Sequence, residues 1–211
     1  EKMEPEEVVT ILNRYTTEMT KIIFKYQGTL DKFIGDSVMA FWGAPVQDEH
    51  QAEHACQTAL EMQRTMRVFS TIPGAPACKL SMRVGINTGT MMAGNMGSDD
   101  RFDFTVIGDH VNIASRLEGL HKVYDTQIII SEFTHKEVGQ KFATRKLDSV
   151  RVKGKARPIV IYELLDEDRA LHIDVFEEGL DLYQMGQFKE AREKFSEAAK
   201  LYPGDHVSLL F

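Results

Sequence analysis

Several features that would narrow the class of protein are scarce or missing in this sequence. It holds two cysteines, Cys56 and Cys78, which are too few for a disulfide scaffold or a four-cysteine zinc site. No apolar run approaches the roughly 20 residues that span a bilayer, and no signal-peptide pattern opens the chain. Basic residues are not in excess either, because 25 Lys and Arg face 32 Asp and Glu, a formal net charge of −7. We therefore expect a cytoplasmic protein with no membrane span and no nucleic-acid partner.

The composition that is present describes a folded protein. Hydrophobic residues make up 43% of the 211 residues and charged residues 27%, which is typical of globular chains and too apolar for a disordered one. The length fits one ordinary domain with a small appendage, or two small domains. We expect a first domain at 1–165, and a linker with a helical segment at 166–211, because a charged run opens the second segment.

The hydrophobic pattern predicts an α+β fold. Residues 1–26 carry apolar side chains at three- and four-residue spacing, the period of one helix face. Residues 30–34 and 37–42 read as two strands joined by Gly35 and Asp36, a two-residue loop that exposes the Asp36 carboxylate. The other expected helices are 49–69, 111–120 and 131–139, and the other expected strands are 80–86, 102–107, 127–130, 150–152 and 159–162. Because strands and helices do not alternate strictly, the sequence predicts a mixed sheet covered by helices.

Four short patterns carry weak chemical signals when each is taken alone. Asn112 and Arg116 are four residues apart near a helix start, where a guanidinium suits a phosphate, although exposed polar pairs on helices are common. Lys153 lies in a compact basic turn that suits either a triphosphate or a solubilising hairpin tip. Asp36 in a Gly-Asp turn is more often a turn former than a metal ligand. The zinc-protease pattern H-x-x-E-H at 50–54 lacks a third marked ligand, which favours a helix surface.

The stretch 85–97 is rich in glycine and is expected to form turns and close backbone approaches. Residues 89–94 begin like a phosphate-binding loop. Asn95 and Met96 then stand where Lys and Ser or Thr are required, so the sequence does not form a Walker motif.

Longer blocks of sequence resemble a known enzyme family. Residues 30–45, LDKFIGDSVMAFWGAP, closely resemble the second signature block of class III nucleotidyl cyclase catalytic domains. Residues 104–118, FTVIGDHVNIASRLE, resemble their transition-state block, and 83–89 and 152–155 occur in the expected order and spacing. The resemblance runs over residues 1 to about 165. It implies a ferredoxin-like α+β core, similar to the cyanobacterial and soluble-type enzymes.

The resemblance also implies a head-to-tail homodimer with active sites shared between the subunits. In this family one subunit supplies two aspartates for two Mg²⁺ or Mn²⁺ ions, and Asp36 matches one of them. The other metal aspartate belongs to a first signature block, which the resemblance places upstream of Glu1. The printed residues alone therefore predict an incomplete metal site.

The remaining site residues match the two blocks and the basic turn. By the resemblance, Lys32 and Thr105 read the base, Asn112 orients the ribose, Arg116 stabilises charge on the transferring phosphorus and Lys153 holds the outer phosphates. The implied reaction is in-line attack of the ribose 3′-hydroxyl on the α-phosphorus, with two metal ions clamping the attacking and leaving oxygens.

The pair Lys32 and Thr105 favours ATP over GTP. A lysine ammonium only donates, which suits the N1 acceptor of adenine, whereas guanine N1 carries a hydrogen. The threonine hydroxyl is able to accept from the adenine 6-amino group. Guanylyl cyclases of the family usually carry Glu and Cys at these two places. The expected products are 3′,5′-cyclic AMP and pyrophosphate.

Residues 176–211 read as purely helical and resemble one tetratricopeptide unit. The residues that fit this helix-turn-helix pattern are Gly179, Leu180, Tyr183, Gly186, Phe188, Ala191, Phe195, Ala198 and Pro203. One repeat cannot bury its own face, so we expect further repeats or a docking surface for a protein partner. An unrelated helical hairpin that packs on the domain is the alternative.

Two main classes of function follow from the sequence, with a weaker third in which the cyclase fold is an inert scaffold for the helical tail. The leading hypothesis is an adenylyl cyclase that acts as a homodimer. The alternative is a catalytically inactive, cyclase-like module that binds nucleotide and regulates its neighbours, which the single matched metal aspartate favours.

Overall fold

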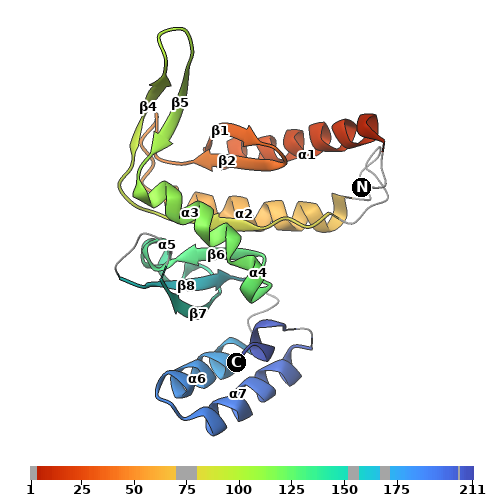
Figure 1. Cartoon of the computed structure of the whole chain (residues 1–211), viewed down its shortest axis with the longest axis vertical. Coiled ribbons are helices and arrows are strands. Elements are labelled where there is room, and N and C mark those ends of the chain that lie inside the picture. The colour runs from red at the N-terminus through yellow and green to blue at the C-terminus, as the bar shows by residue number, and fades with distance from the viewer. Residues whose placement is uncertain (1–3, 70–79, 152–156, 167–171, 204) are drawn as a thin grey trace. The chain divides into compact units, whose positions relative to one another are not determined.

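The computed structural model of the chain describes residues 4–69, 80–151, 157–166, 172–203 and 205–211. They belong to two compact units. The first unit combines residues 1–82 with 90–111, and the second combines residues 83–89 with 112–211. The elements of both units are labelled in Figure 1. Among the described helices, none is long and apolar enough to cross a membrane.

Two helices and two antiparallel hairpins make up the first unit. They are α1 (Pro5–Lys25), β1 (Thr29–Ile34), β2 (Ser37–Phe41), α2 (Gln51–Val68), β4 (Met92–Gly97) and β5 (Phe102–Ile107). β1 pairs with β2, and β4 pairs with β5 in the long hairpin visible in Figure 1. The core of this unit joins the apolar faces of the two helices through Met19, Ile22, Ile23, Met62, Met66 and Phe69.

Close packing after α1 fixes the β1–β2 hairpin. A Cβ atom on Gly28 would lie 2.8 Å from the Trp42 ring, so the chain needs glycine to pass there. Trp42 Nε1 donates a hydrogen bond to the Tyr26 carbonyl at 2.8 Å. At the far end of the hairpin, Gly35 has φ +64°, a left-handed conformation that costs glycine little. Asp36 is exposed at this turn, as the sequence predicts.

The second unit contains a four-stranded mixed sheet in the order β3-β6-β8-β7. Its strands are β3 (Val84–Ile86), β6 (Ile128–Ser131), β7 (Thr144–Val150) and β8 (Ile159–Leu164). β3 and β6 are parallel, whereas β8 is antiparallel to both of its neighbours. Its helices are α3 (Asp109–Gly119, which starts in the first unit), α4 (His121–Tyr124), α5 (Glu132–Val138), α6 (Ile173–Gln184) and α7 (Phe188–Leu201), with 3₁₀ turns at Gly139–Lys141 and Val207–Leu209.

These elements confirm the α+β class with a mixed sheet and a C-terminal helical hairpin. The close backbone approaches expected in the glycine-rich stretch occur at Gly85 and Gly97, where an added Cβ atom would clash with the carbonyl oxygens of Ala114 and Arg101, respectively. The expectation of turns is wrong for β4, which forms a strand. Glycine is a weak local signal against a strand, and the ladder to β5 supplies hydrogen bonds that local composition does not reveal. The strand expected at 80–86 is confined to Val84–Ile86, and β7 begins at Thr144, before the expected residue 150.

The helical hairpin α6–α7 buries its apolar face within the second unit. Phe176, Leu180 and Phe195 are at most 2% exposed, and they belong to one core with Leu147 and Ile161 of the sheet. The two helices lie side by side in Figure 1. The inner face of the hairpin therefore packs within the second unit, and a protein partner at this hairpin stays a prediction.

A buried guanidinium ties the end of the chain to the sheet. Arg145 on β7 is fully buried and donates to Glu163 on β8 at 2.5 Å and to Asp205 at 2.7 and 3.0 Å. Its guanidinium also lies 4.7 Å from the ring centre of Phe176 on α6. Burial alone would lower the pKa of Arg145, but the two carboxylates outweigh it and raise that pKa above its ordinary value. The ion pairs thus compensate the desolvation of three buried charges.

Replacing Arg145 by Ala should lower the free energy of unfolding by about 3–5 kcal/mol, because the substitution removes the shared cation from two buried carboxylates. The matched control is Lys146→Ala on the same strand, where a partly exposed lysine pairs with the exposed Asp181, a contact worth about 1 kcal/mol or less. Urea unfolding of both variants measures the difference. Equal losses in the two variants would contradict a structural role for the buried cluster.

Candidate active site

Asp31 lies at an irregularity in the β1–β2 ladder. Leu30 pairs with Ala40 and Lys32 pairs with Met39, so Asp31 is the extra residue of a β-bulge. Consecutive side chains in a regular strand point to opposite faces, whereas a bulge re-aims a side chain locally. The bulge brings the carboxylate of Asp31 within 3.2 Å of the Nζ atom of its neighbour Lys32.

The Asp31 carboxylate is buried and holds Thr105. Its side chain is 0% exposed, and Thr105 Oγ1 on β5 donates to Asp31 Oδ2 at 2.5 Å. Asp31 Oδ1 accepts no well-aligned hydrogen bond from the described residues and has the Lys32 ammonium beside it. β5 also contacts β2, because the ring centres of Phe104 and Phe41 lie 6.0 Å apart.

The structure therefore brings together the two residues expected to read the base. Lys32 keeps 40% of its side chain exposed and Thr105 is partly buried, so both side chains reach from a buried anchor toward the surface. The cross-strand partner of Thr105 is Gly94, which has no side chain to cover the hydroxyl. A donor-only ammonium and a hydroxyl side by side offer polar contacts to one edge of a planar ring.

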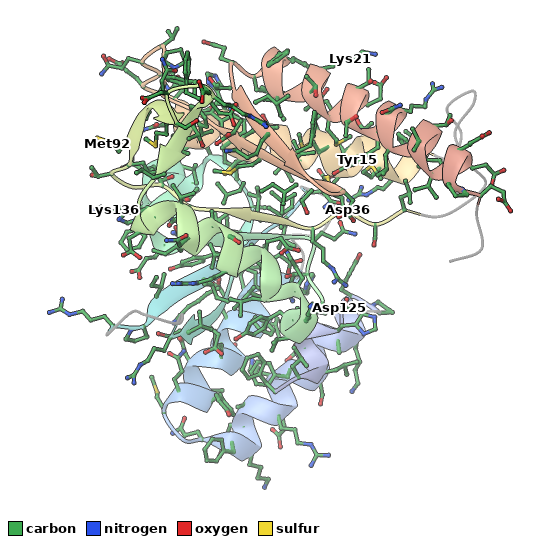
Figure 2. The ribbon with its side chains drawn as sticks, turned by 45° about the horizontal axis from the view of Figure 1, so that its top comes forward. Tyr15, Lys21, Asp36, Met92, Asp125 and Lys136 are labelled. Atoms are coloured by element: carbon green, nitrogen blue, oxygen red, sulfur yellow. The ribbon has the colours of Figure 1, made fainter. Side chains whose placement is uncertain are left out.

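Asp36 is separate from this group, at the turn between β1 and β2. Figure 2 labels it together with Tyr15 of α1. Burial raises the pKa of Tyr15, and the negative charge of Asp36 raises it further. An exposed carboxylate at a turn is a hard oxygen donor, and Mg²⁺ or Mn²⁺ is commonly held by one or two such carboxylates together with nucleotide phosphates.

Asp36 therefore fits the role of one ligand to a divalent ion. The described residues contain no group of three or more His, Cys, Asp or Glu side chains that would enclose a metal by themselves. The carboxylate of Asp31 is engaged by Thr105 and Lys32, so it is not available as a second ligand. The described residues alone therefore do not complete a coordination sphere at Asp36.

Asn112 and Arg116 occupy one side of α3, one turn apart, as their spacing predicts. Asn112 is exposed and Arg116 is partly exposed, while Ile113 and Leu117 on the adjacent side are buried in the core of the second unit. The core thus fixes the rotation of α3 and leaves the two polar side chains accessible. Lys153, expected to hold the outer phosphates, lies outside the described residues.

The zinc-protease pattern at 50–54 forms a helix start. Asp48 Oδ1 accepts from the His50 backbone, and Asp48 Oδ2 lies 2.8 Å from His54 Nδ1. Both histidines thus contact Asp48 at the start of α2, where no side chain caps the first turn, and these contacts agree with the helix-surface interpretation.

Comparison with known proteins identifies the family. The model for the adenylate and guanylate cyclase catalytic domain matches residues 1–166, and a tetratricopeptide repeat model matches residues 175–205. The chain belongs to the class III adenylate and guanylate cyclase catalytic domain family, and its C-terminal hairpin carries a tetratricopeptide repeat. The boundary between the two parts at residue 165 stays a prediction.

Individual relatives include both kinds of cyclase. Adenylate cyclase 1 of Rhizobium meliloti is 36% identical over 173 residues, which cover 82% of this chain and 26% of that protein. The crystal structure of the adenylyl cyclase CyaB from P. aeruginosa has a TM-score of 0.69 and 37% identity, over 81% of this chain and 88% of that one. The guanylyl cyclase Cya2 has a TM-score of 0.67 and 34% identity, over 79% and 85%. Membership of the family therefore does not decide between ATP and GTP.

The chain is short beside its curated relatives. It spans 10% to 33% of the lengths of three adenylate cyclases that it matches. Those proteins hold other regions, so what they do as whole proteins is a separate question from the chemistry of this domain.

Sequence reasoning did not group Asp31 with Lys32 and Thr105. The residue next to Lys32 would point to the opposite face in a regular strand, so the pattern gave no reason to group the two side chains. The bulge that re-aims it depends on pairing with β2, and its partner Thr105 is 74 residues away in the chain.

Thr105→Val should lower the free energy of unfolding by about 1–3 kcal/mol, because it leaves a buried carboxylate oxygen without its donor. Thr105→Ser keeps the hydroxyl and should lose about 1 kcal/mol or less. Thr10→Val on the exposed face of α1 is the matched control, with an expected change within about 0.5 kcal/mol. Chemical denaturation measures all three. A loss in Thr105→Val no greater than in Thr10→Val would contradict the Thr105–Asp31 hydrogen bond.

Proposed function

We propose that this domain is an adenylyl cyclase that converts ATP into 3′,5′-cyclic AMP and pyrophosphate. The observation that carries the proposal is that Lys32 and Thr105 both contact one buried carboxylate, which supports a shared role in recognising one edge of the base. The named adenylyl cyclases among the relatives support the same reaction.

Base recognition follows from hydrogen-bonding chemistry. Lys32 has only donors, and adenine N1 is an acceptor that it satisfies. Guanine offers a donor at N1, which would face the ammonium without a partner. Thr105 offers lone pairs to the 6-amino group of adenine. A site built to hydrogen-bond one edge rejects the other base, because its own polar groups would be left unpaired.

The chemical step forms the bond between O3′ of the ribose and the α-phosphorus and breaks the bond from that phosphorus to pyrophosphate. We assign Asn112 to orient the ribose and Arg116 to stabilise the negative charge that builds up on the phosphoryl oxygens. Lys153 would bind the outer phosphates as a point charge. Asp36 would hold Mg²⁺ or Mn²⁺ together with the nucleotide phosphates, and two such ions supply charge neutralisation when bound.

The proposed site is shared between two copies of the chain. One copy contributes Asp36, and the other contributes the base-reading and phosphate-stabilising side chains. This division makes the dimer a condition for activity, and it can be tested by restoring a site from two damaged chains.

Asp36→Ala and Arg116→Ala should each abolish cyclase activity in the full-length protein, and a mixed dimer should regain it. Each mixed dimer holds one intact site, so a random mixture should reach about a quarter of the wild-type rate. Cyclic AMP formation by co-purified variants measures this. Arg192→Ala on the exposed face of α7 is the control for truncating an arginine and should keep the wild-type rate.

A mixture no more active than the separate variants would contradict the shared site. Nucleotide binding by the wild-type protein without cyclic product would instead favour the regulatory module, a domain that binds nucleotide without turnover.

A further inference from the structure

We infer that Asp31 sets the base specificity of the site by locking the Thr105 hydroxyl as a hydrogen-bond acceptor toward the nucleotide. The inference rests on the proposed function, and it adds a positioning residue that does not itself touch the base. The Thr105 hydroxyl alone does not distinguish the two purine bases. A hydroxyl both donates and accepts, so a free threonine is able to bind the 6-amino group of adenine or the 6-oxo group of guanine.

The buried carboxylate removes this ambiguity. A carboxylate accepts and does not donate, so the 2.5 Å contact between Thr105 Oγ1 and Asp31 Oδ2 consumes the single hydroxyl proton. The lone pairs of Oγ1 are then all that Thr105 presents to a ligand. An amino group meets a partner there, whereas a carbonyl oxygen meets another acceptor. The carboxylate thereby turns a permissive hydroxyl into one that selects adenine.

Lys32 contacts the second oxygen atom of the Asp31 carboxylate. Its Nζ atom lies 3.2 Å from Asp31 Oδ1, so one oxygen serves the ammonium and the other serves the hydroxyl. The Asp31 side chain is 0% exposed, so both contacts lie away from bulk solvent. Asp31 therefore positions both base-reading side chains from one buried point, and the bulge in β1 is the feature that puts it there.

The arrangement makes Asp31→Asn a directed test. Lys32 has only donors, so the amide oxygen of Asn must take the Oδ1 position, and the amide nitrogen must then face Thr105. The amide donates to Oγ1, and the threonine proton turns toward the nucleotide. The same hydroxyl would then suit the 6-oxo group of guanine. Asp31→Asn changes the direction of one hydrogen bond while it keeps the shape of the side chain and an acceptor for Lys32.

The experiment measures nucleotide affinity by displacement of a fluorescent ATP analogue with ATP, GTP and purine riboside triphosphate, in the presence of Mn²⁺. Purine riboside triphosphate keeps the N1 acceptor and lacks the 6-amino group. In the wild-type protein it should bind about tenfold more weakly than ATP, the effect of one lost hydrogen bond. In Asp31→Asn, ATP should lose that advantage, and the ratio of ATP to GTP affinity should fall about tenfold or more.

Two variants isolate the role of Asp31. Asp103→Asn makes the same charge change at an exposed position of β5 and should keep the wild-type ratio. Thr105→Val removes the hydroxyl, and adding Asp31→Asn to it should change the ratio no further. A merely structural role for Asp31 would lower the affinity for all three nucleotides alike and would not depend on the Thr105 hydroxyl.

The outcomes separate the two proposals. An unchanged ATP to GTP ratio in folded Asp31→Asn would overturn the role of Asp31 and leave the cyclase proposal standing. If Asp31→Asn does not fold, the wild-type comparison decides, and equal binding of ATP and purine riboside triphosphate would overturn the inference. A wild-type protein that binds none of the three nucleotides would overturn both.

Discussion

The first unit is organised around one buried negative charge. A carboxylate without partners in a dry interior is costly, so Asp31 requires both the Thr105 hydroxyl and the Lys32 ammonium to be in place. Satisfying it fixes the separation of β1 and β5 and the direction of the bulge. The hairpin that carries Asp36 is an extension of the same strand, so its position depends on the same constraint. The need to pair the buried Asp31 carboxylate thus positions Lys32 and Thr105, the two side chains to which we assign base recognition.

The second unit uses a buried positive charge in a comparable way. Arg145 joins β7, β8 and the segment after α7 through Glu163 and Asp205. Burial alone would raise the pKa of Asp205, but the hydrogen bonds and charge of Arg145 lower it below its ordinary value. This cluster and the apolar face of α6 hold the inner face of the helical hairpin within the second unit. The helical hairpin is part of the core that also fixes α3, which carries Asn112 and Arg116.

Local signals predicted those features that depend on local geometry. The Gly-Asp turn exposes Asp36, and the spacing of Asn112 and Arg116 puts them on one side of α3. Their roles, and those of Lys32 and Thr105, came from the resemblance of long blocks to a family. Asp31 was not predictable, because its orientation depends on a bulge and on a residue 74 positions away. β4 was missed for a similar reason, since its ladder with β5 outweighs the glycines in its own sequence.

The central claim is that this domain cyclises ATP in preference to GTP. The most direct measurement is the initial rate of cyclic nucleotide formation by the full-length protein, with Mn²⁺-ATP and Mn²⁺-GTP assayed in parallel. The account predicts cyclic AMP and pyrophosphate, with kcat/KM for ATP at least about tenfold above that for GTP. Cyclic GMP formed at an equal or higher kcat/KM would contradict the base recognition, and the absence of product from both nucleotides would contradict the assigned reaction.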